Sequence, residues 1–191
     1  MMSLRNYIIY CLLLTFSFGI IFQDSRIDLY YNNEQLKKPF TGGFNRPKIQ
    51  WLDWDYDGDV DLFVLDASGY LRYFDNKGSG QEADLQLTSS YFHNIYCGGW
   101  FYFADFDFDG DFDLMSQNID NPNNVSYFKN IDGLLYYFSN IETISASQYM
   151  TPTFADIDDD NDKDFFVANM NGTLNYYENI GQLDQIPQFE L

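Results

Sequence analysis

Residues 53–61 read DWDYDGDVD, residues 105–113 read DFDFDGDFD, and residues 156–164 read DIDDDNDKD. These three acidic stretches begin 52 and 51 residues apart, and together they hold sixteen of the 29 acidic residues. The chain has 191 residues and a net charge of −19, which would repel a phosphate backbone and excludes nucleic acid as a partner. Aromatic residues make up 20% of the chain, which excludes a disordered acidic segment.

The similarity between the three stretches continues into the residues that follow them. Each is followed by a pair of aromatic residues, an asparagine and a glycine. The sequence therefore divides into repeat units at about 45–90, 97–145 and 150–191, and LYYNN (29–33) marks a partial unit at 27–40. The aromatic pairs and their asparagines are Tyr73-Phe74 with Asn76, Tyr127-Phe128 with Asn130, and Tyr176-Tyr177 with Asn179.

Each unit reads as four short strands separated by turn signals. One such signal is Asn171-Gly172, a dipeptide that predicts a type I′ hairpin. No helical periodicity of useful length follows residue 25. The sequence predicts an all-β fold, a partial β-propeller of about three four-stranded blades plus a half blade. A β-sandwich is the alternative, but it does not predict so regular a period. Trp51, Trp54, Trp100 and the tyrosine pairs are expected to fill the interfaces between blades, and the alternative is that these rings stack on sugars.

The aspartates themselves allow two interpretations. An ordinary strand with acids on one face would place carboxylates about 5 Å apart, where each pair repels by roughly 3 kcal/mol at an effective dielectric near 20. Aspartate is also a poor strand former, and Gly58 and Gly110 interrupt the alternation. A divalent cation bound by a loop removes the repulsion, and Ca²⁺ prefers six to eight oxygen ligands in flexible geometry.

The spacing fits such a loop if positions 1, 3 and 5 supply carboxylates, position 6 makes a sharp turn, position 7 supplies a carbonyl and position 9 closes the shell. Gly58, Gly110 and Asn161 occupy position 6, where a left-handed backbone is needed. Side chains at positions 2 and 4 should point away from the ion. One Ca²⁺ is expected in each of three loops, with these candidate ligands: Asp53, Asp55, Asp57, Asp59 and Asp61; Asp105, Asp107, Asp109, Asp111 and Asp113; Asp156, Asp158, Asp160, Asp162 and Asp164.

The loops are not EF-hands. An EF-hand needs a bidentate glutamate at position 12, where this chain has Val64, Ser116 and Val167. Its loop is also flanked by helices, whereas strands flank the acidic stretches here.

The segment FADIDDDNDKDFFVANMNGTLNYYENIG (154–181) resembles the FG-GAP/VCBS repeat of integrin α-chain-like β-propellers, as do DWDYDGDVDLFV and DFDFDGDFDLM. The resemblance covers residues 27–191. It implies that each loop joins the first two strands of a blade and binds a structural Ca²⁺. Family propellers usually close with about seven blades, which implies that the chain is a fragment of a longer propeller, or that further blades or self-association complete it.

The N-terminus carries a largely apolar run from Tyr7 to Phe22, with Arg5 ahead of it. This run predicts a hydrophobic signal helix at 1–24, cleaved as a signal peptide or retained as an N-terminal anchor, and hence a secreted or cell-surface protein. Cys97 is the only cysteine outside this segment, so no intrachain disulfide is expected in the secreted chain.

The function expected from these features is that of a calcium-binding extracellular module, a structural, adhesion or ligand-binding scaffold for protein or carbohydrate. The alternative is the propeller part of a secreted hydrolase or lyase acting on polysaccharide or phospholipid. An enzyme is not expected, because the acids are committed to the loops and no motif of a catalytic nucleophile is present.

Overall fold

The computed structural model describes residues 30–35, 43–79, 82–144, 151–169 and 171–191. The chain divides into two compact units, 1–42 and 43–191, which are described separately. In the first unit a short hairpin joins β1 (Tyr30–Tyr31) to β2 (Glu34–Gln35) within the expected partial unit. The expected signal helix at 1–24 lies outside the described residues. Where the structure is described, it contains no helix with the length and apolarity needed to cross a bilayer.

The second unit contains three four-stranded antiparallel sheets, and in each sheet the strands lie in sequence order. This confirms the predicted all-β class and is consistent with propeller blades. A short 3₁₀ helix, η1 (Phe92–Asn94), lies between the first two sheets. The strands are β3 (Lys48–Leu52), β4 (Asp61–Leu65), β5 (Leu71–Asn76) and β6 (Leu85–Ser89); β7 (Phe101–Ala104), β8 (Asp113–Gln117), β9 (Val125–Ile131) and β10 (Leu134–Ile141); β11 (Thr151–Ala155), β12 (Asp164–Ala168), β13 (Leu174–Leu183) and β14 (Ile186–Glu190).

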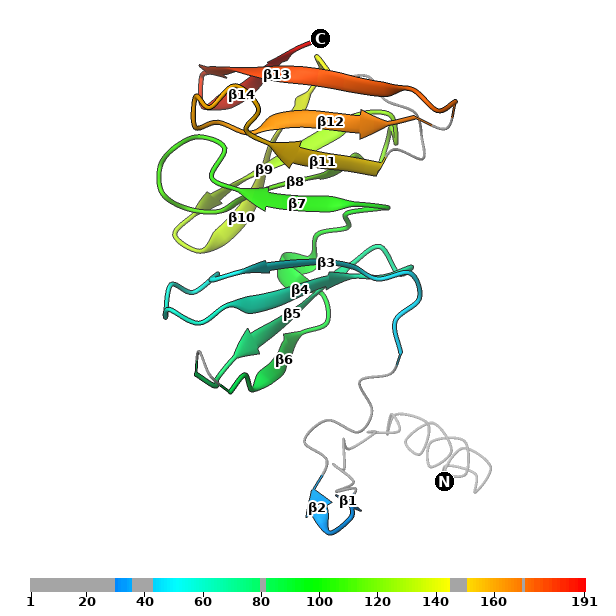
Figure 1. Ribbon diagram of the computed structural model, residues 1–191, viewed down its shortest axis with the longest axis vertical. Helices are drawn as coiled ribbons and strands as arrows, with labels where there is room; N and C mark the ends of the chain where they lie inside the picture. Colours follow the sequence, from blue (N-terminus) through cyan, green and yellow to red (C-terminus); the bar gives the residue numbers. More distant parts are fainter. Residues whose placement is uncertain (1–29, 36–42, 80–81, 145–150, 170) are drawn as a thin grey trace, which may run out of the picture. The chain divides into compact units, whose positions relative to one another are not determined.

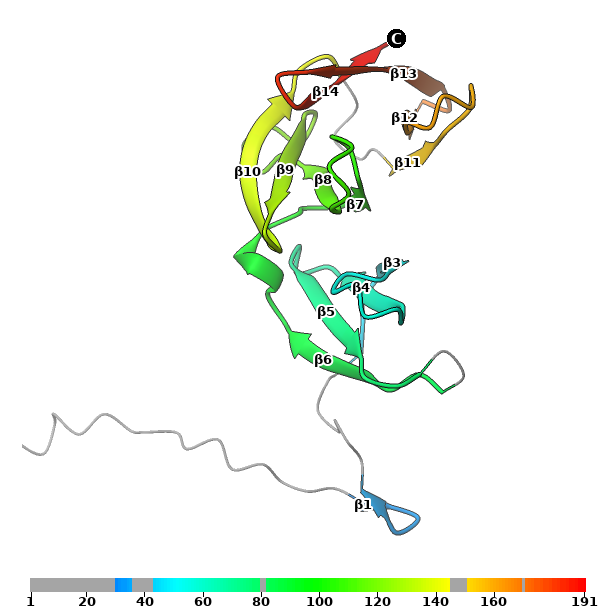
Figure 2. The same cartoon turned by 90° about the vertical axis from the view of Figure 1, so that its left-hand side faces the viewer.

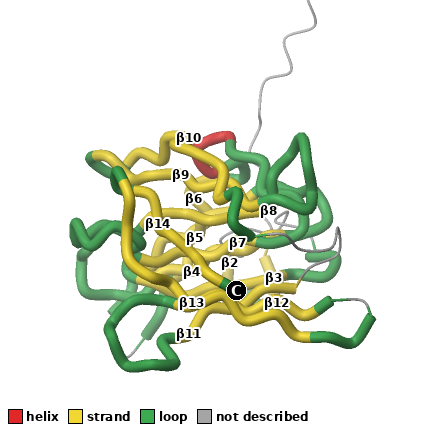
Figure 3. Tube along the Cα trace, turned by 90° about the horizontal axis from the view of Figure 1, so that it is seen from above, coloured by secondary structure: helices red, strands yellow, loops and turns green. Residues whose placement is uncertain are grey.

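The three sheets of this unit are stacked face to face (Figure 1). The first strands β3, β7 and β11 lie along one side of the stack, and β6 and β10 lie along the other (Figure 2). Viewed along the stack, the strands run across the molecule and the loops gather at their two ends (Figure 3). The three loops between the first and second strands all emerge at the same end (Figure 1).

The hydrophobic core lies between neighbouring sheets. Phe63, Leu71 and Tyr73 of the first sheet pack against Phe103 and Leu114 of the middle sheet. A second cluster joins the middle and third sheets, with aromatic side chains from both. Since alternate residues of a strand point to opposite faces, the middle sheet contributes to both clusters.

The three tryptophans differ in their surroundings. Trp100 is buried between the middle and third sheets, and Trp54 packs edge-on against Phe63 and Phe103 between the first two sheets. The prediction was wrong for Trp51, whose side chain is half exposed on the outer face of the first sheet. Strand alternation explains the difference, because Trp51 pairs with Leu62 on the face opposite to the one that packs on the middle sheet.

The hairpin turns also differ from expectation. Asn171 and Gly172 do lie between β12 and β13, but the amide of Gly172 donates to the carbonyl of Asn169 at 3.0 Å, so these two residues are not the central pair of a type I′ turn. Two-residue turns with both φ angles positive occur instead at Asp132-Gly133 and Asp184-Gln185. The latter lacks glycine, which is why its sequence gave little signal.

Phe154 is predicted to be essential to the packing of the middle and third sheets, because its buried ring contacts Tyr102, Phe106 and Phe165. Truncation by Phe154→Ala should lower the free energy of unfolding by about 3–5 kcal/mol, as for other buried phenylalanines. Urea denaturation measures the loss. Ile119→Ala, at an exposed turn position, should change the stability by less than about 0.5 kcal/mol, and equal effects of the two would contradict the packing described.

Candidate metal centre

Each acidic stretch forms the loop between the first two strands of its sheet, so the interpretation as an ordinary strand is wrong. The backbone turns sharply at position 6, where φ is 93° at Gly58, 96° at Gly110 and 76° at Asn161. These values confirm the predicted left-handed turn. The sequence did not predict that position 4 is also left-handed, with φ between 58° and 65° at Tyr56, Phe108 and Asp159. Such conformations are uncommon for side chains of this size and must be held by the rest of the loop.

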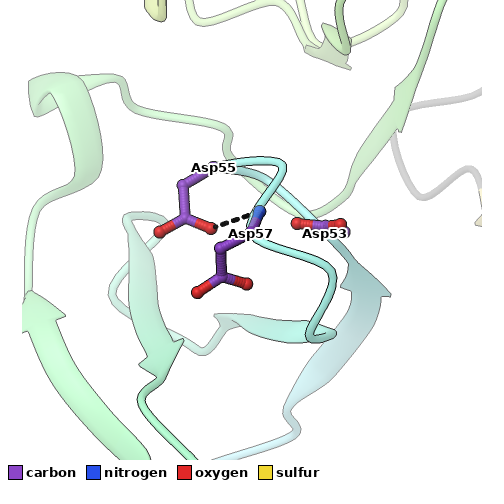
Figure 4. A group of neighbouring side chains, drawn as sticks. All are labelled: Asp53, Asp55 and Asp57. Carbon is purple, nitrogen blue, oxygen red and sulfur yellow. Dashed lines mark hydrogen bonds between the residues drawn. The ribbon is translucent and has the colours of Figure 1, made fainter. Parts of the chain in front are cut away.

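The turns bring three carboxylates of each loop together. Ligand oxygens of Asp53, Asp55 and Asp57 lie within 4.8 Å of one another, and the three residues come from one turn of the chain (Figure 4). The corresponding set in the third loop is Asp156, Asp158 and Asp160. In the second loop the grouped residues are Asp105, Asp107 and Asp113, so position 9 takes the place of position 5.

Main-chain amides hold these carboxylates in place. The amide of position 6 donates to the carboxylate of position 1 in every loop, with N···O distances of 3.0 to 3.1 Å. The amide of position 7 donates to the carboxylate of position 5 at 3.0 Å in every loop. The amides of the loop backbone therefore fix the carboxylates at positions 1 and 5. In the second and third loops a further amide, that of Asp109 or Asp159, donates to the other oxygen of Asp105 or Asp156.

The aspartate at position 9 has a different environment from the others. Asp61, Asp113 and Asp164 are completely buried at the start of the second strand. Asp113 accepts hydrogen bonds from the amide of Asn130 at 2.8 Å, the amide of Phe106 at 3.3 Å and the hydroxyl of Tyr127 at 2.7 Å. Equivalent amide bonds reach Asp61 and Asp164. Position 9 thus ties the loop to the third strand, in addition to any role as a ligand.

The asparagine after the aromatic pair completes this connection, a role that the sequence analysis did not assign. The side chain of Asn130 donates to the carbonyl of Phe112 at 3.1 Å and accepts from the amide of Gly133 at 2.9 Å. Asn76 and Asn179 make the same two types of bond in their own sheets. The asparagine follows the acidic loop at a similar distance in every unit, and this similarity could have predicted the contact.

In the first two loops the position 2 side chains point into the core and those of position 4 to solvent, as expected for residues that turn away from an ion. Trp54 and Phe106 pack between sheets, although Ile157 is exposed. Tyr56 and Phe108 are exposed. The hydroxyl of Tyr56 donates to the carbonyl of Gly110 at 3.0 Å, and its ring stacks on Phe112, so the first two loops are in contact.

Each loop contains one buried carboxylate oxygen that has no hydrogen-bond partner. These atoms are Oδ1 of Asp53, Oδ1 of Asp107 and Oδ1 of Asp162. A buried polar atom without a partner is costly, and native proteins rarely keep one without a ligand or water. The donor set is entirely oxygen, which suits Ca²⁺ or Mg²⁺ and does not suit zinc or copper. The residues present therefore fit a hard divalent cation.

Burial and crowding make the charged state of the loops costly. Burial, with the charges of Asp107 and Asp109 nearby, raises the pKa of Asp113 to about 7. Burial and the neighbouring Asp160, Asp164 and Asp158 raise the pKa of Asp162 to about 7. The same causes raise the pKa values of Asp55, Asp105 and Asp158 above the ordinary range.

Lys129 distinguishes the second loop from the other two. Its ammonium lies against Asp107 and is 3.3 Å from Asp109, and its side chain is largely buried. The same position, just before the asparagine, is Asp75 in the first sheet and Glu178 in the third. The second loop therefore carries its own positive charge where the other units carry a further acid. The sequence analysis missed this residue, although alignment of the units would have revealed it.

Comparison with known proteins identifies part of this arrangement. Residues 53–116 match the family model described as FG-GAP-like repeat, which confirms the resemblance over that range. The matched range begins at the first acidic loop and includes the whole of the second. Searches among curated proteins and among solved structures gave no significant match.

Replacement of Lys129 should strengthen ion binding in the second loop. We expect Lys129→Gln to raise the calcium affinity of that loop about tenfold, since it removes a cation that neutralises the same carboxylates. Calorimetric titration measures the change. Lys77→Gln is the matched control, because Lys77 contacts Asp75 and Asp55 through a half-exposed side chain and should matter less. Unchanged or weaker binding in Lys129→Gln would contradict this role.

The raised pKa values predict an unusual pH dependence for the protein without bound cations. An acid whose pKa is raised by folding binds more protons in the folded state, so stability should fall as pH rises from about 4 to about 7. With excess chelator, the melting temperature should be higher at pH 5.5 than at pH 7.5. With saturating calcium the trend should weaken or reverse, because the ion competes with protons. A chelated protein that is more stable at pH 7.5 would refute the expectation.

Proposed function

We propose, from the premise that residues 53–116 form an FG-GAP-like repeat, that this protein is a calcium-stabilised extracellular β-propeller module that serves as a scaffold for binding or adhesion. The observation that carries the proposal is the recurrence of one arrangement in three loops. Each loop groups three aspartates, and each loop also contains one buried carboxylate oxygen that lacks a partner.

Calcium is the cation that best suits these loops. Mg²⁺ demands near-ideal octahedral geometry at 2.0–2.1 Å, whereas Ca²⁺ accepts irregular shells of six to eight oxygens. In the first loop Asp53, Asp55 and Asp57 would hold the ion, and in the third Asp156, Asp158 and Asp160 would do so. The second loop would use Asp105, Asp107 and Asp113, after the ammonium of Lys129 has moved away from Asp107.

The ion would act on stability, because the loops are part of the sheet framework. Position 9 is bonded to the third strand, and the turn between the first two strands is made of the ligands themselves. A bound cation removes the repulsion between the carboxylates, and any ligand that binds only the folded state stabilises it. The ion has no chemical step to perform in this proposal.

Both the chemistry of the loops and the apolar N-terminal run support an extracellular setting. Loops exposed to solvent and short of preformed ligands favour weak sites, and extracellular calcium modules bind with dissociation constants of about 10⁻⁴–10⁻³ M. The single described cysteine, Cys97, is buried, and burial raises the pKa of its thiol to about 12, so it is unreactive. The partner of such a module would be a protein or a carbohydrate.

We place the chain among binding proteins in preference to the alternative, a secreted hydrolase or lyase. General acid–base catalysis needs a pair of groups free to exchange protons with a substrate. The carboxylates at positions 1, 5 and 9 already accept bonds from their own backbone. Turnover of a polysaccharide or phospholipid that is lost on mutation of an acid outside the loops would favour the enzyme.

Terbium luminescence and thermal melting test the proposal. Excitation of Trp54 and Tyr56 in the first loop should sensitise bound terbium, and calcium should displace it. At free calcium ten times the dissociation constant, each occupied site should add about 1.4 kcal/mol to the free energy of unfolding. The double variant Asp55→Asn/Asp57→Asn should lose the first site, whereas Asp120→Asn, an exposed acid outside the loops, should behave as the parent chain. A melting temperature unaffected by chelator, together with no terbium signal, would refute the proposal.

A further inference from the structure

The cross-strand register gives each sheet two chemically distinct faces. We define the trailing face as the one that packs on the following sheet, and the leading face as the one that packs on the preceding sheet. On the trailing face, Gln50, Phe63 and Tyr73 lie side by side in the first sheet. Their equivalents are Tyr102, Met115 and Tyr127 in the middle sheet, and Thr153, Phe166 and Tyr176 in the third.

The same contact between trailing and leading faces occurs twice within the chain. At the first junction, the Gln50 side chain donates to the carbonyl of Phe103 at 2.7 Å and accepts from its amide at 2.8 Å. At the second junction, Tyr102 takes the place of Gln50 and stacks on Phe154 with ring centroids 4.3 Å apart. Phe103 and Phe154 occupy the same register position, and both are buried.

The trailing face of the third sheet has no described sheet against it, since that sheet lies at the end of the stack (Figure 2). Leu174 on this face is 66% exposed, whereas its equivalents Leu71 and Val125 are completely buried. Ile157 in the third loop is 62% exposed, whereas Phe106 at the same position is buried. The apolar character of the interior junctions is thus repeated on an outer surface.

The leading face of the first sheet, at the other end of the stack, resembles the leading faces that form the interior junctions. Trp51 occupies the register position of Phe103 and Phe154, yet it is 51% exposed. Ile49, two residues earlier, is 57% exposed. Phe44 covers Phe74 on this face, with their ring centroids 6.2 Å apart, and Trp51 and Ile49 remain open beside them.

We propose that the trailing face of the third sheet in one copy of this chain binds the leading face of the first sheet in a second copy. The new junction would repeat the two inside the chain, with Trp51 in the place of Phe103 and Thr153 opposite it in the place of Gln50. This proposal rests on the propeller architecture of the proposed function, because a propeller closes on itself.

The number of sheets selects a dimer. Propellers usually close with four to eight blades, and the described residues of each copy supply three four-stranded sheets, so two copies would supply six. In such a ring each copy gives its trailing face to one junction and its leading face to the other, and a two-fold axis relates the two junctions, so together they form one isologous interface. The net charge of −19 on each copy opposes the association, so salt and bound calcium should both favour it.

Sedimentation velocity of the full chain in calcium tests the proposal. The parent chain should sediment as a dimer at micromolar concentration, and Trp51→Asp or Leu174→Asp alone should weaken dimerisation at least 100-fold, because each variant damages both junctions. An equimolar mixture of the two variants should form dimers again, since a mixed pair retains one intact junction. Ile119→Asp, at an exposed turn of the middle sheet, is the matched control and should dimerise as the parent does.

Three results would overturn the proposal: the parent chain sediments only as a monomer, dimers persist in both single variants, or the mixture fails to restore dimers. Terbium binding is measured on the same samples and separates the two proposals: variants that bind the ion and remain monomeric when mixed would count against the junction alone, whereas dimers without ion binding would count against the calcium function alone.

Discussion

The buried aspartate at the end of each acidic loop is the contact on which the rest of the structure depends. Asp61, Asp113 and Asp164 each join the loop between the first two strands to the asparagine of the third strand. A buried carboxylate is tolerated only when donors surround it, and here backbone amides and, in the first two sheets, a tyrosine hydroxyl do so. The ligand loop is therefore fixed to the sheet by covalent and hydrogen-bonded routes at once.

This arrangement places opposing demands on the same few residues. The folded backbone needs the loop closed, and closure gathers charges that repel one another, as the raised pKa of Asp162 reflects. In the second loop the ammonium of Lys129 neutralises part of that negative charge. The first and third loops, which carry an acid at the equivalent position, depend more on a cation from solution. One repeat can thus yield sites of unequal affinity through a single side chain outside the loop.

Much of the fold was predictable because the spacing of the acidic loops agrees with the spacing of the aromatic runs that follow them. The spacing of the loops gave the number of sheets, and the aromatic runs gave their strands. Trp51 was mispredicted because its burial depends on a neighbouring sheet and not on its own strand. The left-handed backbone of Tyr56 and Phe108 was missed because propensity disfavours it, and the loop imposes it through hydrogen bonds between residues several positions apart. The ammonium in the second loop was missed because it comes from the third strand, and residues so far apart in sequence meet only once the register is known.

The contact between Tyr56 and the turn of the second loop has a consequence for how the loops would fill. The carbonyl of Gly110 that accepts the tyrosine hydroxyl belongs to the residue that shapes the second loop, and the tyrosine itself belongs to the first. Ordering either loop therefore removes part of the entropy cost of ordering the other. Occupancy of the first two sites should be positively cooperative. The third loop should fill independently of them, because the second loop has Phe108 at the position of Tyr56 and so has no hydroxyl there to bond the third loop.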